Sequence, residues 1–188
     1  MFSRGGGGWA AWGLATALVA AAPDAAMAAG GLAPADCSDL ELQIDASFGT
    51  PTCQAASVSN SDARGRAESV QTKETLSFVY AEHIIAGVRT YIQRAAPKDI
   101  VDRTNFADRA KDWGPQFDNH DFAVRRFTLG GVSGEGDLHC VAFAKHWGHV
   151  PQSSGYGHRI MGFYCSALAA DVADVGLDRL LGTMKPGD

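Results

Sequence analysis

The chain has 188 residues, 46% of them hydrophobic, and carries 16 basic against 21 acidic side chains for a formal net charge of -5. This balance excludes a disordered chain, which would be poor in apolar residues. It gives no support for a nucleic-acid-binding protein, which usually carries a basic stripe, and the length favours one domain.

The beginning of the chain has the pattern of a secretory signal peptide. Arg4 supplies a positive charge, residues 9–22 are almost entirely apolar or small, and residues 26–28 form an A-x-A cleavage site. The apolar stretch of 14 residues falls short of the roughly 20 that span a bilayer, and no later stretch is long enough either. We therefore expect residues 1–28 to be removed and residues 29–188 to form a single periplasmic or secreted domain.

The first part of this domain is expected to be mostly irregular. Leu40, Leu42 and Ile44 alternate with other residues, which predicts a short strand with one buried face. The polar residues 57–69 are interpreted as a surface loop.

Residues 74–94 are ambiguous between a helix and strands. Their apolar side chains could line one helical face, yet most of them favour strands, and Gly87 near the middle weakens a helix. We favour two strands, over residues 76–80 and 84–92.

Two amphipathic helices are predicted further along the chain. Over residues 102–113, Phe106, Ala110 and Trp113 share one helical face, and a Gly-Pro pair follows them. Over residues 174–185, four apolar side chains recur at helical spacing.

Three strands between these helices are expected to form an antiparallel meander, over residues 122–129, 138–147 and 158–166. In the last two strands, pairing Trp147 with His158 also places Cys140 opposite Cys165, at a separation that a disulfide can bridge. The predicted fold class is α+β, a single small disulfide-stapled domain. The meander and the earlier strands form one antiparallel sheet, with two helices against one of its faces.

The four cysteines point to disulfides. Cys37, Cys53, Cys140 and Cys165 all lie in the exported part, and an even number in a small exported chain implies disulfide bonds. Three pairings are open, and the two local pairs favour Cys37–Cys53 and Cys140–Cys165. The absence of C-x-x-C spacing argues against a zinc site and against thioredoxin-like redox chemistry.

The C-terminal half carries C-x-A-F at residues 140–143, a glycine-containing loop, G-x-Y-C at residues 162–165 and a short final helix. This arrangement resembles a set of small exported bacterial proteins of unassigned function. The resemblance covers roughly residues 122–185. It implies a structural staple and supplies no catalytic residues.

Three histidines near the end of the expected hairpin are weak candidates for metal ligands. His146 and His149 form H-x-x-H, and His158 lies on the next strand. In the expected register His146 faces Arg159 and His158 faces Trp147, so the two histidines point to opposite faces. A shared metal site is therefore disfavoured, and we expect neither a metal ion nor another cofactor.

A second polar cluster precedes the meander. Asp118, Asn119, His120 and Asp121 could coordinate a cation or serve in acid/base chemistry, but they lack the spacing of a calcium loop. Asp and Asn beside a Gly-Pro pair more often form turns. The sequence therefore contains no complete catalytic constellation.

These observations favour a non-enzymatic exported protein that binds a periplasmic partner or a small ligand. The alternative is an exported hydrolase or metal-dependent enzyme that uses His146 and His149, or Asp118 and Asp121. Neither the ligand nor the oligomeric state follows from the sequence.

Overall fold

The computed structural model describes residues 31–59, 64–74, 76–87, 90–131, 136–151 and 153–184. The signal peptide expected over residues 1–28 lies outside these ranges, as does Lys185 at the end of the predicted final helix. Within the described part, no helix combines the length and apolar character needed to cross a membrane.

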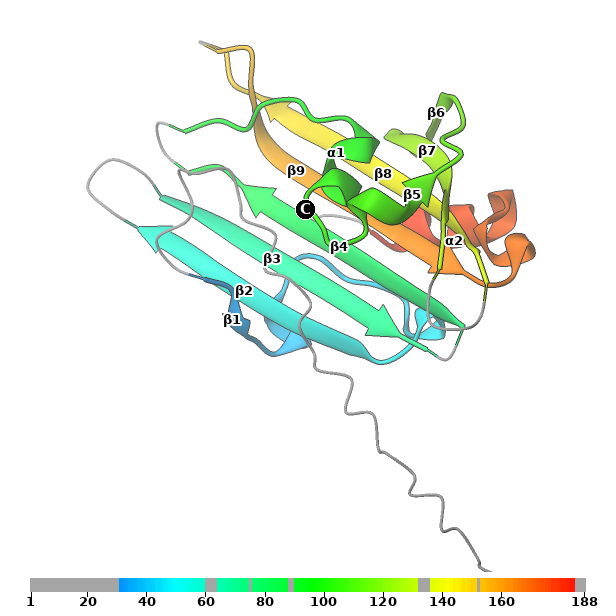
Figure 1. Cartoon of the computed structure of the whole chain (residues 1–188). Helices are drawn as coiled ribbons and strands as arrows, with labels where there is room; N and C mark the ends of the chain where they lie inside the picture. Colours follow the sequence, from blue (N-terminus) through cyan, green and yellow to red (C-terminus); the bar gives the residue numbers. More distant parts are fainter. Residues whose placement is uncertain are drawn as a thin grey trace, which may run out of the picture.

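The described chain forms a single domain built on one nine-stranded antiparallel sheet, with little helix (Figure 1). The strands are β1 Ala33–Pro34, β2 Pro51–Ser59, β3 Arg64–Lys73, β4 Ser77–Ile85, β5 Ala110–Lys111, β6 Gln116–Asn119, β7 Phe122–Leu129, β8 Leu138–His149 and β9 Tyr156–Ser166. The helices are α1 Pro97–Asp102 and α2 Asp174–Thr183. Across the sheet the strand order is β1-β2-β3-β4-β9-β8-β7-β5, and β6 also pairs with β7.

Each face of the sheet is covered by a different part of the chain (Figure 1). On the face that we call the α2 face, α2 and residues 37–48 pack on apolar side chains of the strands. On the opposite face, the α1 face, α1 contributes the buried Ile100 and Val101. Because successive side chains of a strand point to opposite faces, the central strands β8 and β9 are apolar along most of their length.

The C-terminal meander and its register are confirmed. Strands β7, β8 and β9 are neighbours, and Trp147 pairs with His158 as Cys140 does with Cys165. Cys140 and Cys165 form a disulfide with their Cα atoms 4.1 Å apart, as expected for a non-hydrogen-bonded pair. The other two cysteines are also joined to each other and tie residues 37–48 to β2.

The helix predicted over residues 102–113 is wrong. Helix α1 lies earlier because a proline occupies its first turn, and the Asp99 carboxylate accepts a backbone N–H at its start. Beyond Asp102, the side chains of Phe106 and Trp113 pack on the α1 face from a 3-10 turn and irregular backbone. The helical spacing of Phe106 and Trp113 therefore arises from two side chains that pack separately on the sheet. The prediction that both helices cover one face is also wrong, because α1 and α2 pack on opposite faces.

Residues 74–94 do not form the two predicted strands. The strand β4 is continuous from Ser77 to Ile85. The chain rejoins the sheet at Ile92, which forms an isolated bridge with Tyr156. One long strand replaces the expected pair, and residues 88–89 of the predicted second strand lie outside the described ranges.

Two further predictions for the first part of the domain are corrected, and one for its end is confirmed. Leu40 and Leu42 are buried as expected, but in irregular backbone between two 3-10 turns instead of a strand. The predicted loop over residues 57–69 contains the end of β2 and much of β3, with residues 60–63 outside the described ranges. The final helix is present as α2.

Candidate functional site

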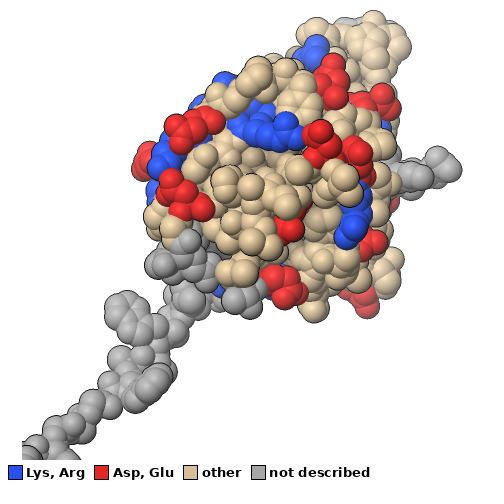
Figure 2. Space-filling view, turned by 90° about the vertical axis from the view of Figure 1, so that its right-hand side faces the viewer, with Lys and Arg blue, Asp and Glu red and all other residues tan. Residues whose placement is uncertain are grey.

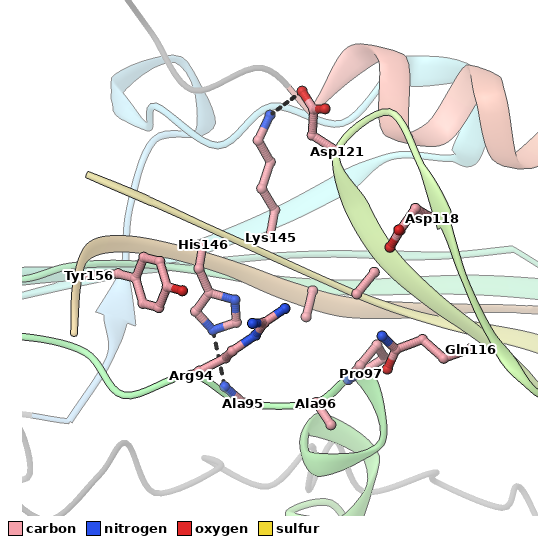
Figure 3. Close-up of a pocket in the computed structure, with 12 residues that line it drawn as sticks. Arg94, Ala95, Ala96, Pro97, Gln116, Asp118, Asp121, Lys145, His146 and Tyr156 are labelled. Atoms are coloured by element: carbon pink, nitrogen blue, oxygen red, sulfur yellow. Dashed lines mark hydrogen bonds and ion pairs between the residues drawn. The ribbon is translucent and has the colours of Figure 1, made fainter. Parts of the chain in front are cut away.

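A pocket opens where strand β8 continues beyond its neighbour β7. The pairing of these strands ends at Ala123 opposite Ala144, while β8 runs on to His149. The segment that leads into α1 and the β6–β7 hairpin border this gap, and together they enclose about 470 Å³ (Figure 3). The pocket is lined by Arg94, Ala95, Ala96, Pro97, Gln116, Asp118, Asp121, Ala123, Ala144, Lys145, His146 and Tyr156.

His146 holds one wall of the pocket in place. Its Nε2 atom accepts a hydrogen bond from the backbone N–H of Ala95 at 3.2 Å. Burial, followed by the positive charges of Arg159 and Arg94, lowers the pKa of His146 to about 4. The ring is therefore neutral near pH 7, and its proton resides on Nδ1 because Nε2 is the acceptor. His146 consequently presents an N–H donor to the pocket.

Charged side chains of both signs surround the pocket. Lys145 Nζ lies 3.9 Å from the carboxylate of Asp121 and 5.4 Å from the centre of the Phe122 ring. Arg94 and Asp118 have no ion-pair partner among the described residues. Figure 3 shows Arg94 beside His146 and Asp118 on the opposite side of the pocket.

The β6–β7 hairpin presents its acidic side chains from a constrained turn. His120 and Asp121 have φ values of 47° and 65°, in the left-handed region that glycine adopts most easily. Asn119 Nδ2 donates to Asp178 Oδ1 at 2.8 Å, and His120 Nε2 lies 3.6 Å from the same oxygen. Asp178 belongs to α2, so the turn is fastened to the far side of the sheet.

A second polar cluster lies buried on the α2 face. His83 is completely buried and stacks on Trp147 and His158, with ring centres 5.4 and 5.8 Å away. Among the described residues neither of its ring nitrogens has a hydrogen-bond partner, and Nδ1 lies 3.8 Å from Glu68 Oε2. Burial, followed by the neighbouring His83, lowers the pKa of His158. The cluster thus disfavours protonation of His158.

Glu68 completes this buried cluster. Its Oε2 atom accepts the backbone N–H of Leu42 at 2.9 Å, and its Oε1 atom lies 2.7 Å from Arg66 Nε. Burial by itself would raise the pKa of Glu68, but His83, the backbone N–H groups and Arg66 outweigh it and lower the pKa. Glu68 is therefore a buried carboxylate that fastens residues 37–48 to the sheet.

The structure brings together some of the residues singled out in the sequence and separates others. His146, Asp118 and Asp121 line one pocket. His158 lies on the opposite face of the hairpin, as the register predicts, and the His149 ring lies against Tyr156 with their centres 6.3 Å apart. Within the described ranges, no group of three or more His, Cys, Asp or Glu side chains is arranged to hold a metal ion.

Sequence reasoning did not identify Arg94 and Tyr156 as pocket residues. The bridge between Ile92 and Tyr156 brings both to the end of β8, and no periodic pattern indicates such a single contact. The one local signal is Pro97, which marks the start of a helix three residues after Arg94.

The pocket presents polar groups of several kinds to a bound molecule. The lone pair that would make His146 a general base is already engaged by a backbone N–H. The pocket offers fixed donors and carboxylate acceptors around a concave surface.

The surface beyond the pocket is electrostatically mixed. In Figure 2, basic and acidic groups are interspersed on the face that is drawn. Arg126 lies 2.6 Å from Asp174, and Lys111 lies 2.7 Å from Asp137. Opposite charges paired in this way create no strong local field of one sign.

No family model, curated protein or solved structure matches the chain.

Proposed function

We propose that this chain is an exported, periplasmic or secreted, domain that binds a small polar ligand without converting it. The two disulfides support an oxidising compartment, and the pattern of residues 1–28 supports export. In this proposal the C-x-A-F … G-x-Y-C motif is the structural staple of the meander, as in the exported bacterial proteins that it resembles.

The observation that carries the proposal is the state of His146. Its Nε2 atom is committed to the Ala95 amide, and its lowered pKa keeps the ring neutral. It is therefore a fixed hydrogen-bond donor in a concave site with several convergent polar groups, the usual composition of a small-ligand pocket.

A thermal-shift screen of small polar metabolites tests the proposal, because a bound ligand stabilises the folded state in proportion to its excess over the dissociation constant. Ala123→Phe is designed to fill the pocket from β7. Val175→Phe, on an exposed position of α2, is the matched control. We expect at least one compound to raise the melting temperature of the parent and of Val175→Phe but not of Ala123→Phe. The proposal fails if no compound does so, or if the shift persists in Ala123→Phe.

A further inference from the structure

We infer that the ligand of this pocket is a zwitterion of dipeptide size, with its carboxylate near Arg94 and its ammonium group near Asp118. This inference rests on the proposed function, because it names the ligand class for the same pocket.

One end of the pocket is built to receive an anionic group. Arg94 supplies a guanidinium group, and its charge lies close enough to His146 to disfavour protonation of that ring. The Nδ1–H group of His146 and the hydroxyl of Tyr156 add two neutral donors at the same end (Figure 3). A carboxylate accepts several such bonds at once, and bonds to a charged donor are the strongest of them.

The other end offers acceptors. The Asp118 carboxylate and the Gln116 amide border it. The nearby Asp121 carboxylate is offset by Lys145 at 3.9 Å. One positive and one negative side chain, Arg94 and Asp118, are thus left without an ion-pair partner among the described residues.

This arrangement discriminates between classes of ligand. A multiply charged anion would be repelled by the carboxylate of Asp118, and a metal cation would be repelled by the guanidinium group of Arg94. A neutral sugar would gain no ion pair from either of these two exposed groups. A zwitterion pairs both, and pairing opposite charges across a site favours the matching ligand over wrong ones.

The open edge of β8 favours a peptide over a free amino acid as the ligand. Because Cys140 and Cys165 form a non-hydrogen-bonded pair of β8 and β9, the even-numbered residues of β8 direct their backbone N–H and C=O groups away from β9. For His146 these groups lie on the edge where pairing with β7 has already ended. A peptide unit between the two charged ends of the ligand can pair with them, as in strand addition to a sheet edge.

Calorimetric titration with alanyl-alanine tests the inference, with two capped forms as probes of each end. N-acetyl-alanyl-alanine lacks the ammonium group, and alanyl-alanine amide lacks the carboxylate. We expect the parent protein to bind the zwitterion about tenfold more tightly than either capped form, the value of one charge-assisted hydrogen bond.

Two variants, each of which removes one charge from the pocket, test which end of the ligand each side chain binds. Arg94→Gln should weaken binding of alanyl-alanine about tenfold but leave binding of the amide unchanged. Asp118→Asn should also weaken binding of alanyl-alanine about tenfold but leave binding of the acetylated form unchanged. Arg179→Gln and Asp174→Asn change the net charge equally on α2 and should leave every titration as in the parent.

The outcomes separate this inference from the proposed function. If the capped forms bind as tightly as the zwitterion, the inference is wrong. It is also wrong if alanyl-alanine does not bind while another compound stabilises the protein in an Ala123→Phe-sensitive manner, and the proposed function then still holds. If neither alanyl-alanine nor any compound of the screen binds the parent, both fail.

Discussion

The turn at the tip of the β6–β7 hairpin contains backbone strain that one substitution should release. The positive φ of Asp121, 65°, lies in a region that costs a residue with a side chain about 1–2 kcal/mol and glycine nothing. Two effects reduce this gain: aspartate tolerates the region better than most residues do, and glycine has a larger conformational entropy in the unfolded chain. Asp121→Gly should therefore stabilise the protein by about 0.5–1 kcal/mol. In a domain of this size that corresponds to a rise of about 1–4 °C in melting temperature.

The Asp121 side chain contributes little that would offset this gain. It is 89% exposed, and its carboxylate lies 3.9 Å from Lys145 Nζ. An exposed pair of this kind contributes about 0–1 kcal/mol. Loss of the carboxylate should therefore have a smaller effect on stability than relief of the backbone.

Two further substitutions at this position separate backbone from charge. Asp121→Ala removes the same carboxylate but retains the strain, so it should destabilise the protein by about 1 kcal/mol. Asp121→Asn keeps a residue that tolerates positive φ and should be nearly neutral. Differential scanning calorimetry should rank glycine above aspartate and asparagine, with alanine lowest. Any change in alanyl-alanine binding should be equal in all three variants, and an alanine variant as stable as the glycine variant would refute the strain argument.

Other positions yield predictions of the same kind. Replacing Cys140 and Cys165 together by alanine opens a loop with a sequence separation of 25 residues and should lower the free energy of unfolding in urea by about 3.5 kcal/mol on the chain-entropy model; a loss near zero would contradict that model. Because the pKa of His146 is lowered to about 4 from 6.5, the unfolded chain binds a proton that the folded chain does not. Stability should therefore fall as pH drops from 6.5 toward 4, less steeply in His146→Gln, in urea titrations at a series of pH values. Gly162→Ala places a Cβ against the backbone of β4 and should lower the melting temperature through a cost of about 1–3 kcal/mol, whereas Gly182→Ala, in open space on α2, should raise it.

The strands were predictable where two independent constraints agreed. In the meander, the alternation of buried side chains and the spacing of Cys140 and Cys165 both require the same register, and a slip of one residue would have violated both. For residues 102–113 the signals were the helical spacing of three side chains and the Gly-Pro pair that follows them. The same spacing arises when Phe106 and Trp113 pack as separate anchors, so the pattern did not distinguish the two structures.

Only some residues of the pocket were predictable from the sequence, because the order of the strands in the sheet decides which residues come together. His146, Asp118 and Asp121 were recognised as polar residues of interest. Their proximity depends on β7 ending before β8 and on the return of the chain at Ile92. Neither feature has a local pattern in the sequence, since both are set by which strands become neighbours.

The two polar sites of the protein share one strand pair. His146 and Trp147 are adjacent on β8, so their side chains point to opposite faces, His146 into the pocket and Trp147 into the buried cluster with His83 and His158. Burial lowers the pKa of His158, and lowers that of His146 to about 4, so His146 adds no charge to the pocket between pH 6 and 8. The charge that a ligand meets in that range is set by the carboxylates, the guanidinium and the ammonium group of the pocket. Affinity should therefore be nearly constant from pH 6 to 7 and should fall toward pH 8 as the α-amino group of the ligand, with an ordinary pKa of about 7.7–8.0, loses its proton. Acid should act first on the stability of the sheet that carries both sites.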